Sequence, residues 1–212
     1  MILNKKIKIF ILAGETSGDY IGSCIIKGVK KYNDNIIFFG VGGNLMQNEG
    51  LVSLYNIQEF NVIGFVNTII NLKKLRNYIN EMVKLIIKEK PHIVITIDTK
   101  GFSLALAKSL KIAFKKSDFK CPLVHFVPPT IWAYGKSRIT KWKNLHDELI
   151  CLYKIEEDIF KNYDTKCTYI GNPIIEKFLN FEKLPKNKNN NLNPLKKINC
   201  LLLPGSRSKE IE

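Results

Sequence analysis

Short apolar runs alternate with amphipathic segments along most of the chain. Runs such as 8–13 and 93–97 consist mainly of large apolar residues, which is typical of parallel strands buried on both faces. Segment 72–90 instead carries apolar residues at helical spacing with Lys and Glu between them, and Pro91 ends it. The pattern predicts strands at 8–13, 36–39, 51–55, 93–97, 122–127, 149–152 and 168–170, and helices at 20–32, 45–49, 72–90 and 103–114.

This alternation predicts an α/β fold with a doubly wound parallel sheet and right-handed crossovers. Ligands of such sheets bind at the carboxyl ends of the strands. The loops in which to look for a site are therefore 14–19, 40–44, 98–103, 128–138 and 171–173.

The pattern changes after residue 180. Segment 181–197 is rich in Lys, Asn and Pro and has no apolar period, which is typical of a linker. A last apolar run, 200–203, breaks into Pro204, Gly205 and Ser206, as a strand, a tight turn and a helix start would. We therefore predict a first domain over 1–180, a linker over 181–197, and the start of a second domain over 198–212.

The chain is strongly basic. It has 33 Lys and Arg against 19 Asp and Glu, a formal net charge of +14, yet its only arginines are Arg76, Arg138 and Arg207. Because lysine lacks the planar fork that reads guanine bidentately, sequence-specific nucleic-acid binding is disfavoured. The charge fits either an attraction to anionic membrane or phosphorylated lipid, or a plain bias toward Lys, Asn and Ile.

Cysteines and the N-terminus narrow the class of protein further. The five cysteines are scattered and never spaced as CxxC, so neither a disulfide framework nor a metal site is expected, and buried free thiols are the simplest interpretation. The N-terminus leads into a strand and not into a signal-peptide core, and no apolar run approaches the length of a membrane span. We expect a cytoplasmic protein.

Loop 14–19, Gly-Glu-Thr-Ser-Gly-Asp, follows the first strand. Its glycines are not spaced as in a dinucleotide fingerprint, and no P-loop lysine follows. One interpretation is a tight turn in which Ser17 or Asp19 caps the next helix. The other is a binding loop in which Glu15 and Asp19 bond sugar hydroxyls beside exposed backbone amides, with Ser17 among the contacts. The spacing leaves both open.

Asp98 follows the strongest of the predicted strands, 93–97. A carboxylate placed there faces the ligand crevice and could remove a proton from a hydroxyl. The alternative is that it caps the following helix. Asn172, in Gly171-Asn172-Pro173, is either part of a turn or a polar wall of the same crevice.

Segment 128–138 combines aromatic, proline and basic residues. Trp132 and Tyr134 could stack on a sugar ring, while Arg138, with Lys136, could meet a phosphate. The alternative is a rigid aromatic plug against the core. Segment 60–70 is unusually apolar and is followed by Lys73 and Lys74, which suits a membrane-surface contact, an acyl-chain groove or an ordinary core helix.

Several of these segments, in this order and spacing, resemble the lipid-A-disaccharide synthase family. The resemblance covers essentially all of the chain, and seven motifs in register are specific where any one is weak. They are Ala13-Gly-Glu-Thr-Ser-Gly-Asp19, Gly40-Val-Gly-Gly43 with Met46 and Gly50, Val62-Ile-Gly-Phe65, Ile97-Asp98, His125-Phe-Val127 with Trp132-Ala133, Gly171-Asn-Pro173, and Leu203-Pro-Gly-Ser-Arg207.

The resemblance implies a two-domain GT-B glycosyltransferase, of which 1–180 would be the Rossmann-like, acceptor-side domain. Such an enzyme joins UDP-2,3-diacylglucosamine to 2,3-diacylglucosamine 1-phosphate (lipid X), releases UDP and uses no metal or cofactor. Asp98 matches the family's essential aspartate, expected to be the base or to orient the acceptor. Arg207 matches the essential arginine, expected to stabilise UDP beside Ser206. The expected place is the inner face of the bacterial inner membrane, with peripheral attachment, and the oligomeric state stays open.

The chain departs from the family pattern in three places. Lys100-Gly101-Phe102-Ser103 stands where Pro-Asp-Phe-Asn is common, so a second acidic residue is missing. Pro128 replaces a serine, the basic residue of that loop is displaced to Lys136 or Arg138, and Asn172 stands where histidine is typical. These changes affect the fine contacts to the acceptor more than the reaction class.

The family continues for roughly 150 residues more, about one domain, and that half supplies most of the UDP site. We therefore expect this chain to be a fragment that is inactive alone. The alternative is an inactive lipid- or nucleotide-binding module that retains the first domain. A sugar-nucleotide epimerase is disfavoured by the Gly-Glu-Thr-Ser-Gly-Asp and Trp-Ala motifs.

Overall fold

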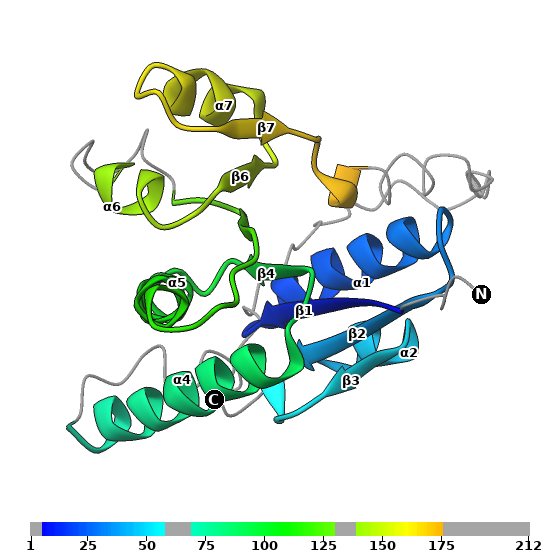
Figure 1. Cartoon of the computed structure of the whole chain (residues 1–212). Coiled ribbons are helices and arrows are strands. Elements are labelled where there is room, and N and C mark those ends of the chain that lie inside the picture. Colours follow the sequence, from blue (N-terminus) through cyan, green and yellow to red (C-terminus); the bar gives the residue numbers. More distant parts are fainter. Residues whose placement is uncertain (1–5, 58–68, 130–138, 176–212) are drawn as a thin grey trace, which may run out of the picture. The chain divides into compact units, whose positions relative to one another are not determined.

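A sheet of seven parallel strands runs through the described part of the chain (Figure 1). The computed structural model describes residues 6–57, 69–129 and 139–175, which belong to one unit, Met1–Glu176. The strand order is β3-β2-β1-β4-β5-β6-β7, which confirms the predicted doubly wound sheet. The strands are β1 (Ile7–Ala13), β2 (Ile36–Val41), β3 (Leu51–Ser53), β4 (Ile93–Ile97), β5 (Leu123–Phe126), β6 (Glu148–Cys151) and β7 (Cys167–Tyr169).

The four predicted helices are present, and the structure adds two short ones. The described helices are α1 (Thr16–Lys30), α2 (Asn44–Asn48), α4 (Ile69–Glu89), α5 (Lys100–Lys115), α6 (Ile139–Lys143) and α7 (Lys154–Lys161). The predicted start of α1 was four residues late, because the helix begins directly after Glu15, whose backbone is extended. Helices α6 and α7 were missed because five and eight residues are too few to establish an apolar period.

The side chains of strand β1 enter core clusters on both faces of the sheet. Phe10 and Leu12 belong to one core cluster with residues of α4 and α5, whereas Ile9 and Ile11 belong to another with residues of α1 and α2. Side chains alternate between the faces of a strand, so a strand covered on both faces must be apolar at every position. This is the continuous run that the sequence shows.

Beyond β5 the sheet is held by a smaller core and by ion pairs. The third core cluster lies under α6 and α7 and contains Trp142, Leu149, Phe160 and two buried thiols, Cys151 and Cys167. The contact with Cys167 and burial raise the pKa of Cys151, so this thiol is not nucleophilic. Cys24 and Cys121 are only half-buried, which corrects the expectation of buried thiols for those two.

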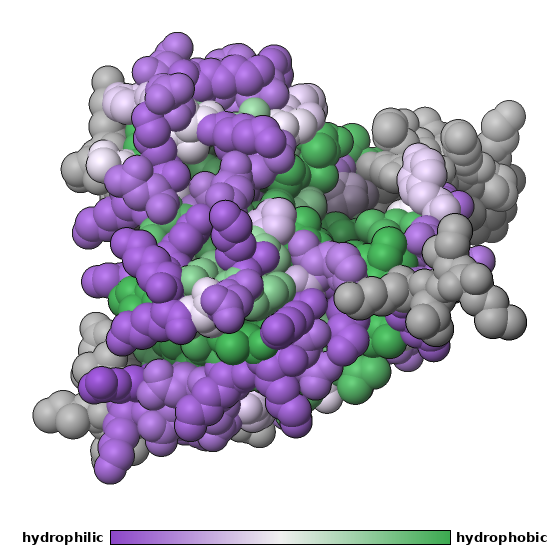
Figure 2. All heavy atoms as spheres, in the orientation of Figure 1, coloured by the Kyte–Doolittle hydropathy of each residue, from purple (hydrophilic) through white to green (hydrophobic). Residues whose placement is uncertain are grey.

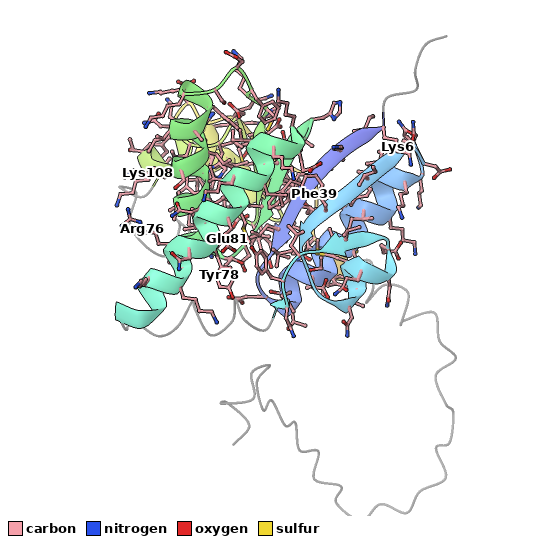
Figure 3. All side chains as sticks on the ribbon, turned by 60° about the horizontal axis from the view of Figure 1, so that its bottom comes forward. Lys6, Phe39, Arg76, Tyr78, Glu81 and Lys108 are labelled. Atoms are coloured by element: carbon pink, nitrogen blue, oxygen red, sulfur yellow. The ribbon has the colours of Figure 1, made fainter. Side chains whose placement is uncertain are left out.

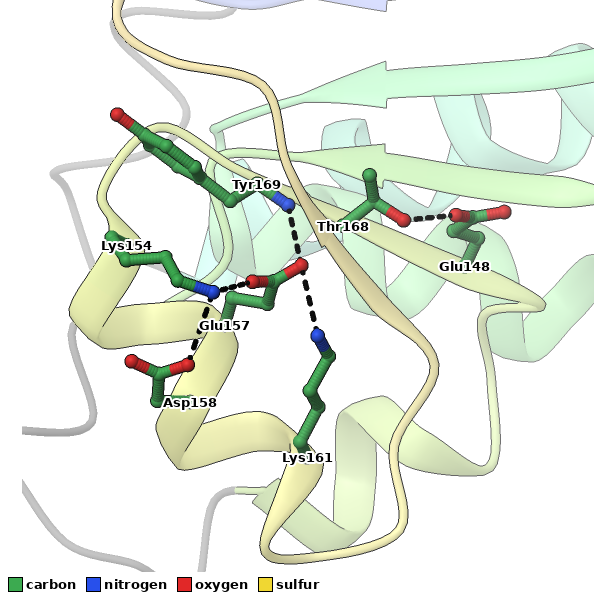
Figure 4. A network of polar contacts seen from close by, with 7 residues as sticks. All are labelled: Glu148, Lys154, Glu157, Asp158, Lys161, Thr168 and Tyr169. Carbon is green, nitrogen blue, oxygen red and sulfur yellow. Dashed lines mark hydrogen bonds and ion pairs between the residues drawn. The ribbon is translucent and has the colours of Figure 1, made fainter.

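Glu157 joins α7 to β7 (Figure 4). Its carboxylate pairs with Lys154 and with Lys161 at 3.2 Å, and it accepts a hydrogen bond from the backbone N–H of Tyr169 at 3.1 Å. These contacts, with Lys154 first, lower the pKa of Glu157 to about 2. The negative charge of Glu157 therefore stabilises the contact between α7 and β7.

Helix α4 is fixed by contacts of Tyr55, just after β3. The Tyr55 hydroxyl donates to Glu81 at 2.6 Å, and the Tyr55 and Tyr78 rings meet edge to face at 4.9 Å. Figure 3 shows Arg76 on the same helix and Lys108 on α5, both of which are exposed. In Figure 2 hydrophilic side chains cover most of the face shown, as the net charge of +14 requires. No helix in the described ranges is long and apolar enough to cross a membrane.

Two buried histidines form a cluster of three rings with Trp142 of α6. The ring centroids of His125 and Trp142 lie 4.3 Å apart, and those of Trp142 and His146 lie 5.1 Å apart in a stacked arrangement. His125 Nδ1 meets the Thr96 hydroxyl at 2.8 Å, but its Nε2 and both nitrogens of His146 have no partner within the described part. Burial holds the pKa of His125 well below its usual range and lowers that of His146 to about 4.

We expect this stack to make the fold sensitive to mild acid. The pKa of His146 is lower in the folded chain than its usual 6.5, so below pH 6.5 the unfolded state binds more protons and stability falls toward pH 4. Urea unfolding should show a loss of about 2 kcal/mol between pH 7.5 and pH 5 from this residue alone.

The variant His146→Phe keeps the stacking and removes the titration, so its stability should vary less over this pH range. His92→Phe, which removes the exposed third histidine, is the control. Equal pH dependence of the parent and His146→Phe would contradict the assignment.

Candidate functional site

The carboxyl ends of the strands meet at one edge of the sheet, here named the carboxyl edge. The strand order reverses between β1 and β4, so the loops after these two strands leave toward opposite faces, and the ligand crevice of a doubly wound sheet is expected at this point. Glu15 follows β1 and Asp98 follows β4, and their strands pair directly through Ala13 and Ile97. The topology therefore brings side by side the two loops that carry these residues, which are 83 positions apart in the sequence.

The turn from β1 into α1 offers backbone donors. The first hydrogen bond of the helix runs from Asp19 N–H to the Glu15 carbonyl at 2.9 Å, so the N–H groups of residues 16–18 precede the helical ladder. Ser17 is exposed beside them. Glu15 is the N-cap residue, and no side chain caps the helix, so the interpretation that Ser17 or Asp19 caps it is wrong. Exposed amides at a helix start suit an anionic group of a ligand.

Asp19 points away from that turn and fixes α2. Its Oδ1 accepts from the N–H groups of Gly43 at 2.8 Å and Met46 at 3.0 Å, and its Oδ2 accepts from Leu45 at 3.1 Å. A Cβ at residue 43 would lie 2.4 Å from Oδ2, so only glycine allows this approach. The sugar contact expected of Asp19 stays a prediction, and a sugar would have to compete with these three amides.

Asp98 ends β4 in an unusual backbone conformation. Asp98 and Thr99 both have left-handed backbone, with φ of 48° and 46°. The N-cap of α5 is Thr99 and the helix has no side-chain cap, so the alternative in which Asp98 caps the helix is wrong. The carboxylate is 27% exposed, and among the described residues its ion partner is Lys100, at 3.9 Å. A carboxylate that is half-buried and not used for capping is available for chemistry.

Strain also marks the neighbouring strand end. Val127, directly after β5, has φ of 63°, which is rare for a β-branched residue. Left-handed backbone at a residue other than glycine costs of order 1–3 kcal/mol and gathers at functional sites. Lys90 and Asp164, which share this conformation, lie just after α4 and before β7, whereas Asp98, Thr99 and Val127 lie at the carboxyl ends of β4 and β5.

Asn172 lies in the loop after β7. Its Oδ1 accepts from the N–H of Ile174 at 3.0 Å, which closes a turn, and its Nδ2 donates to the Tyr153 hydroxyl at 3.2 Å. It also lines a mainly apolar groove of about 310 Å³. The other residues of that groove are Ile21, Cys24, Ile25, Phe126, Leu152, Ile170, Gly171 and Pro173. Asn172 therefore takes part in a turn, as one interpretation expected, while its place in the wall of the ligand crevice and its contact with substrate stay predictions.

A second, polar hollow of about 400 Å³ lies at the ends of β2 and β3. It is lined by Gly42, Gly43, Asn44, Gln47, Ser53 and their neighbours as far as Ile57. The glycines of the 40–44 loop were the signal for it in the sequence, but no residue there was singled out as a ligand.

Five of the predicted site residues lie outside the described residues. They are Trp132, Tyr134, Arg138, Ser206 and Arg207. Segment 60–70 lies outside as well, except for its last two residues in α4. Among the residues that are described, no group of three or more His, Cys, Asp or Glu side chains could hold a metal ion.

Comparison with known proteins gives a consistent set of relatives. Residues 9–212 match the family model described as lipid-A-disaccharide synthetase. The probable mitochondrial lipid-A-disaccharide synthase of Arabidopsis thaliana is 33% identical over 99% of this chain and 49% of its own length. The lipid-A-disaccharide synthase of Rickettsia canadensis is 36% identical over 96% of this chain and 52% of its own. The chain spans about half the length of these curated relatives.

Solved structures share the fold. The crystal structure of Anabaena HepE in complex with UDP and glucose has 13% sequence identity and a TM-score of 0.50, and the likeness covers 78% of this chain and 44% of that one. At this identity the likeness shows the α/β fold alone.

The contacts of Asp19 generate a prediction about stability. Asp19→Asn keeps the shape but turns an amide group toward backbone N–H donors, so we expect the free energy of unfolding to fall by about 2–3 kcal/mol. Urea unfolding should show a lower midpoint with an unchanged slope. Asp34→Asn, at an exposed position between α1 and β2, is the control, and equal midpoints for the two variants would refute the role.

Proposed function

Because this chain belongs to the lipid-A-disaccharide synthase family, we propose that it acts in glycosyl transfer within lipid A biosynthesis. The proposed reaction moves 2,3-diacylglucosamine from its UDP derivative to 2,3-diacylglucosamine 1-phosphate (lipid X). The products are lipid A disaccharide 1-phosphate and UDP. This chain would be the acceptor-side half of such an enzyme.

The observation that carries the proposal is the place of Asp98. Its half-buried carboxylate follows the strand at which the sheet order reverses, on a strained turn that does not cap α5. There it would take the proton of the acceptor 6-hydroxyl while that oxygen attacks the anomeric carbon. The bond from the anomeric carbon to UDP would break from the opposite face, and the diphosphate would leave with the electron pair, which inverts the configuration.

The other predicted residues fill supporting roles in this scheme. Arg207, with Ser206, would stabilise the departing diphosphate, because a guanidinium is permanently charged and bonds phosphate oxygens in pairs. Ser17 and the amides at the start of α1 would bind a further anionic or hydroxyl group. Glu15 and Asn172 would bond sugar hydroxyls. We propose no metal ion for these steps.

We propose contacts for the loop before α6 and for the membrane. Trp132 and Tyr134 would stack on a sugar ring, and Arg138 would meet the acceptor phosphate. The excess of lysine would hold the protein at the anionic inner face of the bacterial inner membrane as a peripheral protein.

We also propose a division of the chain into domains. Residues 1–180 would form the acceptor-side domain, 181–197 a linker, and 198–212 the first strand and loop of a UDP-sugar domain. The chain spans about half the length of its curated relatives. We therefore propose that glycosyl transfer also requires the other half, which the relatives possess.

An assay of UDP release from UDP-2,3-diacylglucosamine and lipid X tests the function. We expect activity from a form extended to the length of the relatives and none from the 212-residue chain. Asp98→Asn in the extended form should lower kcat by about 100-fold or more, the usual contribution of a general base, and Arg207→Ala should also lower it strongly.

Asp118→Asn, at an exposed position, should leave the rate unchanged. An active extended form in which Asp98→Asn matches the parent would remove Asp98 from the mechanism. An inactive extended form, with lipid X still bound by the 212-residue chain, would favour a lipid-binding module instead.

A further inference from the structure

We propose that Thr99 is a positioning residue that fixes Asp98 relative to the turn carrying Glu15. The proposal rests on the proposed function, in which Asp98 is the base and Glu15 a sugar ligand. Thr99 itself would touch neither the sugar nor the reacting atoms. Its hydroxyl would act by tying the loop after β4 to the loop after β1.

The tie is a hydrogen bond across the crevice. Thr99 Oγ1 accepts from the backbone N–H of Gly14 at 3.1 Å, joining residues that are 85 positions apart in the sequence. Gly14 directly precedes Glu15, and Thr99 directly follows Asp98. One bond therefore sets the spacing of the two backbone segments that carry the predicted carboxylates.

Gly14 and Thr99 also fit each other in shape. A Cβ placed on Gly14 would lie 2.7 Å from Thr99 Oγ1 and 2.9 Å from Thr99 Cγ2, both too close for real atoms. The absence of a side chain at residue 14 is thus what lets the hydroxyl reach the backbone N–H. The two loops are packed as closely as backbone and a threonine allow.

The left-handed backbone at Thr99 indicates that the threonine side chain is needed at this position. Left-handed backbone disfavours β-branched residues, and glycine or asparagine would adopt it at lower cost. The Thr99 hydroxyl itself donates to the Ile97 carbonyl at 3.4 Å. The conformation is further held by Asp98 N–H to the Phe126 carbonyl at 2.9 Å, Ser103 N–H to the Thr99 carbonyl at 3.0 Å, and Ser103 Oγ to the Asp98 carbonyl at 2.9 Å.

The ordinary role of a threonine at this position is excluded by its contacts. Thr99 is the N-cap residue of α5, where a threonine hydroxyl usually accepts from an N–H of the first helical turn. Here it makes no capping bond and accepts from Gly14 instead. The Thr99 hydroxyl therefore bonds the loop after β1 and does not cap α5.

Three variants test the proposal. Thr99→Val has the same shape and the same aversion to left-handed backbone, but it removes the hydroxyl. Thr99→Ser restores the hydroxyl. Thr168→Val is the matched control, because it removes a threonine hydroxyl that bonds Glu148 at 2.7 Å on the exposed strand β7.

Two measurements separate positioning from stability. In the 212-residue chain, hydrogen exchange at the Gly14 amide should be faster in Thr99→Val than in the parent and should return in Thr99→Ser. In the extended enzyme, Thr99→Val should lower kcat by about 10- to 100-fold, as a displaced base does, with KM for lipid X and the Tm little changed. Thr99→Ser should recover most of the rate, and Thr168→Val should keep all of it.

Parent-like kcat in Thr99→Val would overturn the proposal, as would a rate that falls only in proportion to Tm. If the extended enzyme is inactive in every form, the proposed function fails and the positioning role falls with it. The amide exchange of the 212-residue chain would in that case still show whether the tie itself exists. An active enzyme with a parent-like Thr99→Val refutes the role of Thr99 alone.

Discussion

The pairing of β1 with β4 is the constraint on which the rest of the described structure depends. Both strands are buried on their two faces, and the direction in which the chain adds strands reverses between them. The helices that follow them cover opposite faces of the sheet, while the first residues of their loops stay in contact through Gly14 and Thr99, so the topology fixes where a ligand crevice is expected. Every predicted site residue that the structure describes, except Asn172, lies on or next to one of these two loops.

The sequence predicted the features that depend on local pattern. Strands buried on both faces appear as continuous apolar runs, and the ends of such runs located Glu15 and Asp98 at the carboxyl edge. The role of Asp19 could not be predicted, because its partners are 24 to 27 positions away and no local rule connects them. The left-handed backbone at Asp98 and Thr99 could not be predicted for a different reason. Glycine in a turn indicates left-handed backbone, whereas aspartate and threonine are common in other conformations. Helices α6 and α7 were too short for their periodicity to show.

Two neighbouring parts of the β5–β7 side of the sheet should respond differently to acid, because different groups stabilise them. Near β5 and α6, neutral buried histidines stabilise the fold above their ordinary pKa, and that stabilisation is lost as pH falls from 6.5 toward 4. Near β7, the charge of Glu157 stabilises the fold above its unfolded pKa and is lost only as pH falls toward 2. The region under α6 should therefore weaken before the contact of α7 with β7.

The strained residues at the carboxyl edge indicate which side chains the fold must retain. Each left-handed residue costs of order 1–3 kcal/mol, which is large against a typical total stability of about 5–15 kcal/mol. Glycine, which would adopt left-handed backbone without strain, does occur at the neighbouring positions 101 and 171. Its absence at 98, 99 and 127 indicates that the side chains there are needed. Val127 packs in the core on the α1 face, which accounts for its side chain. Thr99 accepts from Gly14, which accounts for its hydroxyl. Among the described residues, the Asp98 carboxylate accepts no hydrogen bond and its ion partner is Lys100, at 3.9 Å, so a bond of its side chain to the fold does not account for the strained backbone at this position.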